Sequence, residues 1–307
     1  ITKTATRSPN NSKITVYNLA PATRALFEKP DSKCEFYAGY AQDAGPVLMH
    51  SGNIVFAYTR REGPSFATEI QLSDGHVEAR DGMVSIQIPV NGLSTNALTQ
   101  IASQMGLSLY MDKGILSRTW AHGFSFYGPG RIALTKICSA TGLEWSIQNG
   151  FLQIINRGGV TQRKGFVLKS TTGMILSPER LREGSRESAT IVGSTNDQKL
   201  LANKVLIGQR LQFNGWRVRS LLLPSPGPGD SIVLDSLDVQ GQFRIQKVIH
   251  RGDSYGGNWE SEFDLLKPND YAVAVAQYDQ KVAHRAAAAA KRAARAAKKA
   301  AKARGSI

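Results

Sequence analysis

The chain has 307 residues, of which 41% are hydrophobic and 20% are charged. This length and composition fit two or three globular domains and exclude an intrinsically disordered chain. The formal net charge is +14, but nine Lys or Arg and no acid follow residue 280. Subtracting these nine charges leaves +5, so we expect a mildly basic body and a separate basic tail.

Only two cysteines occur, and no Cys-x-x-Cys pair is present. These counts predict no disulfide framework and no cysteine-based metal or redox site, and we expect no cofactor. The first eleven residues are polar, and no stretch approaches the ~20 apolar residues of a membrane span. We therefore expect a protein made in a reducing cytoplasm, without a secretory signal.

Residues 1–91 are predicted to form a first β-barrel domain, built mainly of hairpins. A short helix is expected at 22–28, and Asp74-Gly75 indicates a tight turn. The strand predictions are 13–19, 33–40, 47–60 and 66–72.

Residues 92–157 are predicted to be a small inserted αββαββ domain. Apolar spacing indicates helices at 94–105 and 131–141. Asn149-Gly150 lies between two alternating segments and predicts a hairpin, because both turn positions need a positive φ. The strand predictions here are 107–111, 123–127, 143–148 and 151–155.

Residues 158–270 are predicted to form a second β-barrel domain. A polar excursion at 177–203, with a helix near 197–203, interrupts it. The segments 66–72 and 259–265 share the pattern aromatic-x-x-Glu-apolar-x-Leu, which indicates either two related barrels or the general likeness of β-hairpins. Its strand predictions are 166–169, 174–176, 216–223, 231–237, 242–250 and 259–265.

Residues 271–307 form a tail rich in Ala, Lys and Arg, predicted to be helical over 284–304. The tail is either an electrostatic arm for a polyanion, such as DNA or an acidic partner, or a solvated extension. The candidate polyanion-binding residues are Arg285, Lys291, Arg292, Arg295, Lys298, Lys299, Lys302 and Arg304.

No convincing catalytic or metal motif occurs, and we expect a protein that is not an enzyme. Cys138 is expected to be a core residue, and Cys34 has no activating base in the sequence. The densest polar group, near His250, indicates either an acid–base dyad or, in preference, a hairpin loop that contacts another subunit. The candidate interface residues are Arg60, Arg61, Glu62, His250, Arg251 and Asp253.

Several short motifs occur in a characteristic order between residues 13 and 267. They include Ser51-Gly52-Asn53-Ile54 and Thr141-Gly142-Leu143-Glu144-Trp145. Gly215-Trp216, Pro228-Gly229-Asp230 and Gly252-Asp253 come later in the chain. In this order the chain resembles the baseplate hub proteins of contractile-tailed phages, and the 94–156 unit is similar to small α+β domains of secretins at the level of fold.

The resemblance implies a structural homotrimer in the baseplate of a virion tail, assembled in the host cytoplasm. Two barrels in each of three chains would give a pseudo-sixfold ring that joins a hexameric tail tube to a trimeric central spike. Tape-measure protein, baseplate wedge proteins and DNA in the channel are further expected partners. Such an adaptor requires that the regions around Phe66 and Trp259 be related modules, and we set one common sheet as an observation against it.

Three other functions stay open. A secretin- or pilus-type envelope component predicts an export signal or a membrane segment. A tail-associated hydrolase predicts paired carboxylates or a zinc site, and Glu179, Glu183 and Glu187 share one polar segment, although a salt-bridged surface explains them better. A nucleic-acid-binding protein would depend on the tail alone.

Overall fold

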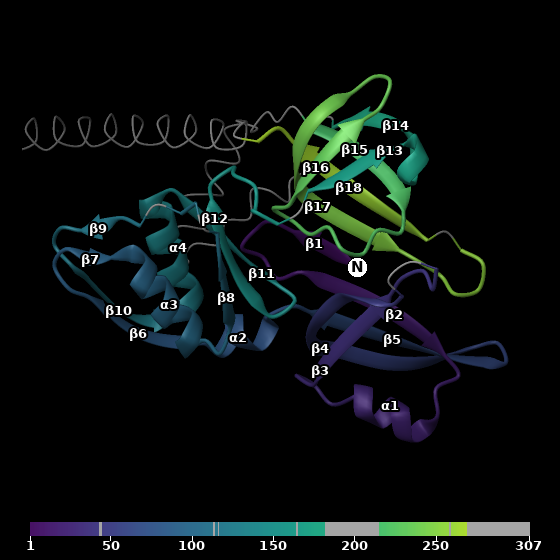
Figure 1. Ribbon diagram of the computed structural model, residues 1–307. Helices are drawn as coiled ribbons and strands as arrows, with labels where there is room; N and C mark the ends of the chain where they lie inside the picture. Colours follow the sequence, from purple (N-terminus) through teal and green to yellow (C-terminus); the bar gives the residue numbers. More distant parts are fainter. Residues whose placement is uncertain are drawn as a thin grey trace, which may run out of the picture.

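A computed structural model describes residues 1–42, 45–112, 114–115, 117–163, 165–181, 215–257 and 259–268. The predicted helices at 197–203 and 284–304, Glu183, Glu187 and every candidate residue of the basic tail lie outside the described residues. The described part is mainly β, with helices concentrated in one unit, as the sequence predicted (Figure 1).

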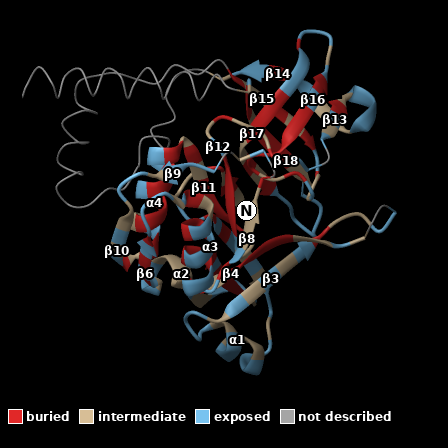
Figure 2. Cartoon of the chain, turned by 60° about the vertical axis from the view of Figure 1, so that its left-hand side comes forward, coloured by how far each residue is buried: buried red, intermediate tan, exposed pale blue. Residues whose placement is uncertain are grey.

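The first 73 residues form a five-stranded portion of the main sheet, in the order β1-β2-β5-β4-β3. Helix α1 begins at a proline that presets its first turn, and it buries none of its residues, so no part of it is red in Figure 2. The elements are β1 (Thr2–Thr4), β2 (Asn11–Tyr17), α1 (Pro21–Phe27), β3 (Lys33–Ala38), β4 (Val47–Glu62) and β5 (Ser65–Ser73).

The middle of the chain forms the α+β unit, which lies on the left of Figure 1. The two long helices pack on each other and on the strands, and their apolar faces join one large buried cluster. The elements are α2 (His76–Asp81), β6 (Met83–Ile88), β7 (Gly92–Leu93), α3 (Ser94–Gln104), β8 (Ser108–Met111), β9 (Thr119–Trp120), β10 (Phe124–Pro129), α4 (Gly130–Thr141), β11 (Leu143–Gln148) and β12 (Phe151–Asn156).

The predicted boundary at residue 92 leaves out part of this core. Val84, Ile86 and Ile88 of β6 are buried in the cluster, because β6 pairs with β10. Ala79 of α2 also packs against the cluster, and we therefore propose that the α+β unit begins near His76.

The last described part forms the second portion of the main sheet, in the order β14-β15-β18-β17, and β16 pairs with both β17 and β13. Its core is a separate buried cluster centred on Phe243, Val248 and Phe263. The elements are β13 (Phe166–Lys169), the 3₁₀ turn η1 (Ser170–Thr172), β14 (Met174–Arg180), β15 (Gly215–Leu221), β16 (Ser231–Asp235), β17 (Gln240–Arg251) and β18 (Glu260–Leu266).

Strand β1 joins the two portions into one eleven-stranded sheet, since it pairs with β17 on one side and with β2 on the other. Strand β5, which contains Phe66, and strand β18, which follows Trp259, therefore lie in a common sheet. This is the observation that we set against the adaptor. This observation counts against the adaptor as the sequence analysis framed it. Two related modules that meet edge to edge share a sheet by definition, so only their internal geometry can tell whether they are repeats.

Candidate assembly interface

Strands β2, β3, β4 and β5 correspond in chain order and in sheet order to β15, β16, β17 and β18. Both sets run as an antiparallel ladder in which the fourth strand lies between the first and the third. Seven residue pairs join β5 to β2, and seven residue pairs join β18 to β15 in the same register. In this register Glu69 of β5 and Glu262 of β18 occupy matching positions. We call β1–β5 the first module and β14–β18 the second module.

An irregularity in the ladder recurs at the same point of both modules. The register of β4 shifts between Ile54 and Phe56, directly after the pair Ile54–Leu72. The register of β17 shifts between Ile245 and Lys247, directly after the pair Ile245–Leu265. Because a bulge changes the twist of its strand, a matched bulge gives both modules the same local curvature.

The turns that precede β3 and β16 also have the same backbone hydrogen bonds. Ile54 exchanges backbone hydrogen bonds with Asp31 and Ser32, and Ile245 does so with Gly229 and Asp230. Asp31 and Gly229 both adopt a positive φ, of 61° and 89°. Each follows a proline, Pro30 or Pro228. The order, register, bulge and turn therefore indicate two copies of one module.

Each module holds a nearly buried glutamate on its central strand. Glu69 accepts hydrogen bonds from Tyr58 and Gln71 and lies 2.7 Å from the Lys13 ammonium group. The hydrogen bond from Lys13 is the main reason that the pKa of Glu69 falls to about 2. These bonds tie β5 to both neighbouring strands.

In the second module, Glu262 occupies the matching site, and arginines surround it. It lies 3.3 Å from Arg217, 3.5 Å from Arg219 and 3.2 Å from Arg251. Arg217 also binds Asp264 with two hydrogen bonds of 2.8 and 3.1 Å. The shared pattern found in the sequence therefore marks matching ion-pair sites on the two central strands.

The α+β unit is held against the first module by a buried polar junction around Asp74. The Asp74 carboxylate is fully buried and accepts hydrogen bonds from the backbone N–H groups of Asn149 and Gly150, at 2.5 and 2.9 Å. Asn10 donates to the carbonyl oxygen of Ile147 and to the side chain of Gln148. Burial raises the pKa of Asp74, so the charged form depends on these donors.

Lys3 lies in the same junction and donates a 3.0 Å hydrogen bond to the Asn149 side chain. Burial lowers the pKa of Lys3 to about 8. A second buried contact joins the α+β unit to the second module, where fully buried Arg244 forms an ion pair with Glu144. Burial raises the pKa of Glu144. Buried polar groups thus join the α+β unit to both modules, and the sequence did not predict these contacts.

The predicted interface residues Arg60, Arg61 and Glu62 lie together near the exposed end of the β4–β5 hairpin. Arg60 forms a 2.5 Å ion pair with Glu62, and the Arg61 side chain donates to the carbonyl oxygen of Gly63. Such exposed pairs contribute little to stability, which leaves their charges available to a partner.

The placement of His250 in an exposed loop was wrong. His250 lies inside β17, is buried, and shares a 2.8 Å hydrogen bond with Ser261, and burial lowers its pKa to about 3. The reason is that β17 extends to Arg251, because β1 and β18 pair with it there. Arg251 and Asp253 are exposed, and Asp253 accepts a 2.8 Å hydrogen bond from the Tyr255 backbone.

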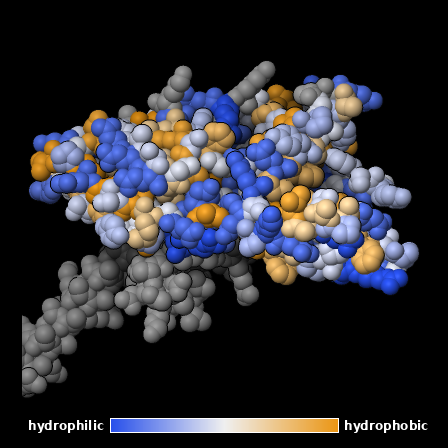
Figure 3. Space-filling model, turned by 90° about the horizontal axis from the view of Figure 1, so that it is seen from below, coloured by the Kyte–Doolittle hydropathy of each residue, from blue (hydrophilic) through white to orange (hydrophobic). Residues whose placement is uncertain are grey.

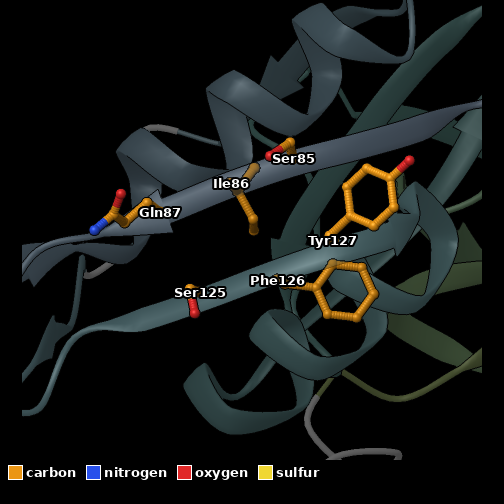
Figure 4. A pocket seen from close by; sticks show the side chains of 6 residues that line it. All are labelled: Ser85, Ile86, Gln87, Ser125, Phe126 and Tyr127. Atoms are coloured by element: carbon orange, nitrogen blue, oxygen red, sulfur yellow. The ribbon is translucent and has the colours of Figure 1, made fainter.

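A groove of about 450 Å³ lies on the paired strands β6 and β10 (Figure 4). Its lining carries hydroxyl, amide, aromatic and aliphatic groups but no carboxylate, imidazole or thiol. It therefore offers no acid–base pair. The lining residues are Ser85, Ile86, Gln87, Ser125, Phe126 and Tyr127.

The cysteines are not activated. Cys138 is buried, and burial raises its pKa to about 12, while burial also raises the pKa of the half-buried Cys34. Among the described residues, no group of three His, Cys, Asp or Glu is placed to hold a metal ion. In the same part of the chain, no helix has both the length and the apolar character needed to cross a membrane.

Apolar side chains reach the surface at several places among the described residues. From below, hydrophobic and hydrophilic residues alternate over both lobes (Figure 3). Exposed aromatic residues include Tyr17, Phe56 and Phe66 of the first module.

Three solved structures share this fold over most of their length. The chain aligns with the 43 kDa tail protein of prophage MuSo2 from Shewanella oneidensis at 9% identity and a TM-score of 0.55, covering 88% of this chain and 92% of that one. The tail protein from Neisseria meningitidis MC58 aligns at 11% identity and a TM-score of 0.56, covering 88% and 91%.

The third structure is an Escherichia coli component of the type VI secretion system, described as similar to the T4 bacteriophage tail proteins gp27 and gp5. It aligns at 11% identity and a TM-score of 0.55, covering 87% of this chain and 72% of that one. No protein-family model matches the chain, and a search of curated proteins found no match. At these identities the likeness concerns the fold, which this chain shares with structural proteins of tail-like machines.

Proposed function

We propose that the protein is a structural, non-enzymatic hub of a phage-type tail, in which three copies form a ring of six related modules. The single observation that carries the proposal is the matched register, bulge and turn of the two modules. Two repeats in each of three subunits give six comparable surfaces, while the ring as a whole keeps threefold symmetry. Such a ring suits the junction between a sixfold tube and a threefold spike.

The shared fold supports this proposal over its alternatives. The neighbours are tail proteins and a component of a related secretion machine, and their similarity extends over the modules and the α+β unit together. We propose the tail tube protein and the central spike protein as partners and a baseplate location, with tape-measure protein, wedge proteins and DNA as further contacts.

The mass of the purified protein in solution tests the proposal. Sedimentation equilibrium or native mass spectrometry should give about three times the chain mass of 33.3 kDa. The measurement is repeated with the cognate spike protein added, because formation of the ring can require the spike. A chain that stays monomeric in both conditions would contradict the hub.

Deleting residues 281–307 tests whether the ring assembles without the basic tail. These residues carry nine of the positive charges, and we propose that they contact a polyanion. The shortened chain should form the same trimer but lose salt-dependent binding to DNA. Loss of the trimer would assign assembly to the tail instead of the modules.

A further inference from the structure

The two modules can be compared position by position on the sheet face that carries Glu69 or Glu262, which we call the glutamate face. Side chains alternate between the two faces of a strand, so the register of each glutamate identifies its neighbours on this face. In the first module they are Lys13, Thr15 and Tyr17 of β2, Phe56, Tyr58 and Arg60 of β4, and Ala67 and Gln71 of β5. The matching residues of the second module, in the same order, are Arg217, Arg219, Leu221, Lys247, Ile249, Arg251, Glu260 and Asp264.

The two glutamate faces differ in their chemistry. The first module has three aromatic residues on this face, Tyr17, Phe56 and Tyr58. None of the matching residues in the second module is aromatic, and all of them except Leu221 and Ile249 are charged. Ion pairs between the arginines and carboxylates already described cover much of the face of the second module. Each chain therefore has one aromatic glutamate face and one charged glutamate face.

The aromatic residues of the first module are accessible and partly fixed in place. Tyr17 is 58% exposed and Phe56 is 54% exposed. The ring of Phe56 lies 5.5 Å from the ring of Tyr58, and the Tyr58 hydroxyl donates a 2.9 Å hydrogen bond to Glu69. Aromatic side chains held in position in this way are the usual anchors of protein interfaces, because they bury a large area at a small cost in conformational entropy.

The ends of β4 and β17 are alike in the two modules, in contrast to the glutamate faces. Arg60 corresponds to Arg251 by register, and both are exposed. An acidic residue follows two positions later in each module, Glu62 or Asp253. Each chain therefore presents two similar charged ends.

We propose that the glutamate face of the first module binds the threefold partner of the proposed hub, the central spike, through apolar side chains that pack on Phe56 and Tyr17. A partner with six identical subunits makes each contact six times, so it requires six surfaces of the same chemistry. Three chains supply six similar strand ends but only three aromatic glutamate faces. A partner anchored on these aromatic residues is therefore repeated three times around the ring, and the sixfold tube binds elsewhere.

This inference rests on the proposed ring, and it is tested by measuring the binding of the trimer to the cognate spike protein and to the cognate tube protein separately. Phe56→Ala removes an aromatic anchor. Leu221→Ala is the matched control, because Leu221 takes the place of Tyr17 on the other face and is 52% exposed. Circular dichroism and the mass of the trimer show that both variants fold and assemble.

We expect Phe56→Ala to raise the Kd for the spike about 10- to 100-fold and to change the Kd for the tube less than about threefold. Leu221→Ala should leave both constants unchanged. An unchanged affinity of Phe56→Ala for the spike, or an equal loss of affinity for the tube, would overturn the assignment and leave the ring standing. A chain that stays monomeric with the spike added would overturn the ring and the assignment together.

Photo-crosslinking gives a second measurement that does not depend on the loss of a contact. A photoreactive side chain placed at position 56 should capture the spike, whereas the same group at position 221 should not. Capture of the tube from position 56, or of neither protein, would overturn the inference.

Discussion

Removing the Asp74 carboxylate should undock the α+β unit from the first module. The two oxygens bind two different backbone groups of the β11–β12 turn, Asn149 N–H and Gly150 N–H. The substitution Asp74→Ala leaves both donors without their partner in a buried site. Each unsatisfied buried donor costs about 1–3 kcal/mol, so the upper limit is about 6 kcal/mol.

The expected loss lies in the lower part of this range. Burial raises the pKa of Asp74, which means that the folded protein is already destabilised by the buried charge. Alanine removes that cost together with the hydrogen bonds, and we expect a net loss of about 2–4 kcal/mol in the free energy of unfolding. Asp74→Asn keeps one acceptor and should lose about 1–3 kcal/mol, because only one donor then lacks a partner.

Denaturant unfolding gives the free energies, and amide exchange at Asn149 and Gly150 locates the effect. Asp253→Ala is the matched control, since Asp253 also accepts a backbone N–H but in an exposed loop where water can replace it. The control should change stability by less than about 0.5 kcal/mol. Equal losses for Asp74→Ala and Asp253→Ala, or unchanged exchange at Asn149 and Gly150, would refute the reasoning.

Two further predictions concern buried ionisable groups. Glu144→Gln breaks the buried ion pair with Arg244 and should lower the free energy of unfolding by about 3–5 kcal/mol. The double variant Arg244→Met with Glu144→Leu should recover much of that loss. Denaturant midpoints of the original chain and the two variants measure the effect, and a double variant as unstable as Glu144→Gln would contradict this expectation. Burial lowers the pKa of both His50 and His250 to about 3, whereas the pKa of an unfolded histidine is about 6.5. Between these values the unfolded chain binds more protons than the folded chain. The free energy of unfolding should therefore fall as the pH drops from about 6.5 toward 3. Thermal midpoints measured across this pH range should fall less steeply for His50→Leu with His250→Asn, and an unchanged slope would contradict this assignment.

The sequence predicted best those elements that local chemistry determines. The Asn149-Gly150 hairpin is confirmed, with φ of 54° and 79°, and so are the two long helices, α3 and α4. Apolar spacing sets those helices, and their buried residues follow it.

The elements missed depend on distant partners. Strand β1 has the polar sequence Thr2-Lys3-Thr4 and is a strand because β17 pairs with it. The turn predicted at Asp74-Gly75 is present, but helix α2, which follows it, and the bonds of the Asp74 side chain to the hairpin 149–150 were not predicted. Since no local pattern identifies a partner 75 residues away, the buried junction could not be predicted.

The repeat was only partly visible in the sequence for a similar reason. The pattern shared by the two central strands contains the ion-paired residues Glu69 and Glu262 and the buried apolar residues that follow them. Pro30 and Pro228, followed by residues with a positive φ, were a further signal that went unused. Strand β2 and strand β15 have little sequence in common, and only their pairing with the central strands shows the correspondence.

The two modules differ in how their apolar residues are buried. One cluster of ten buried apolar residues forms the core around the second module and β13, whereas the buried apolar residues of the first module are divided between Ile54, Ile70 and Leu72 in one cluster and Ala38 and Met49 in another. A small core stabilises a module weakly on its own. The first module also carries exposed Tyr17, Phe56 and Phe66. The α+β unit contacts the first module through the Asp74 junction, through the ion pair of Arg80 with Asp31 and through a hydrogen bond from Ser51 N–H to the Asn149 side chain. A module with exposed aromatic residues and a divided core gains stability from such contacts.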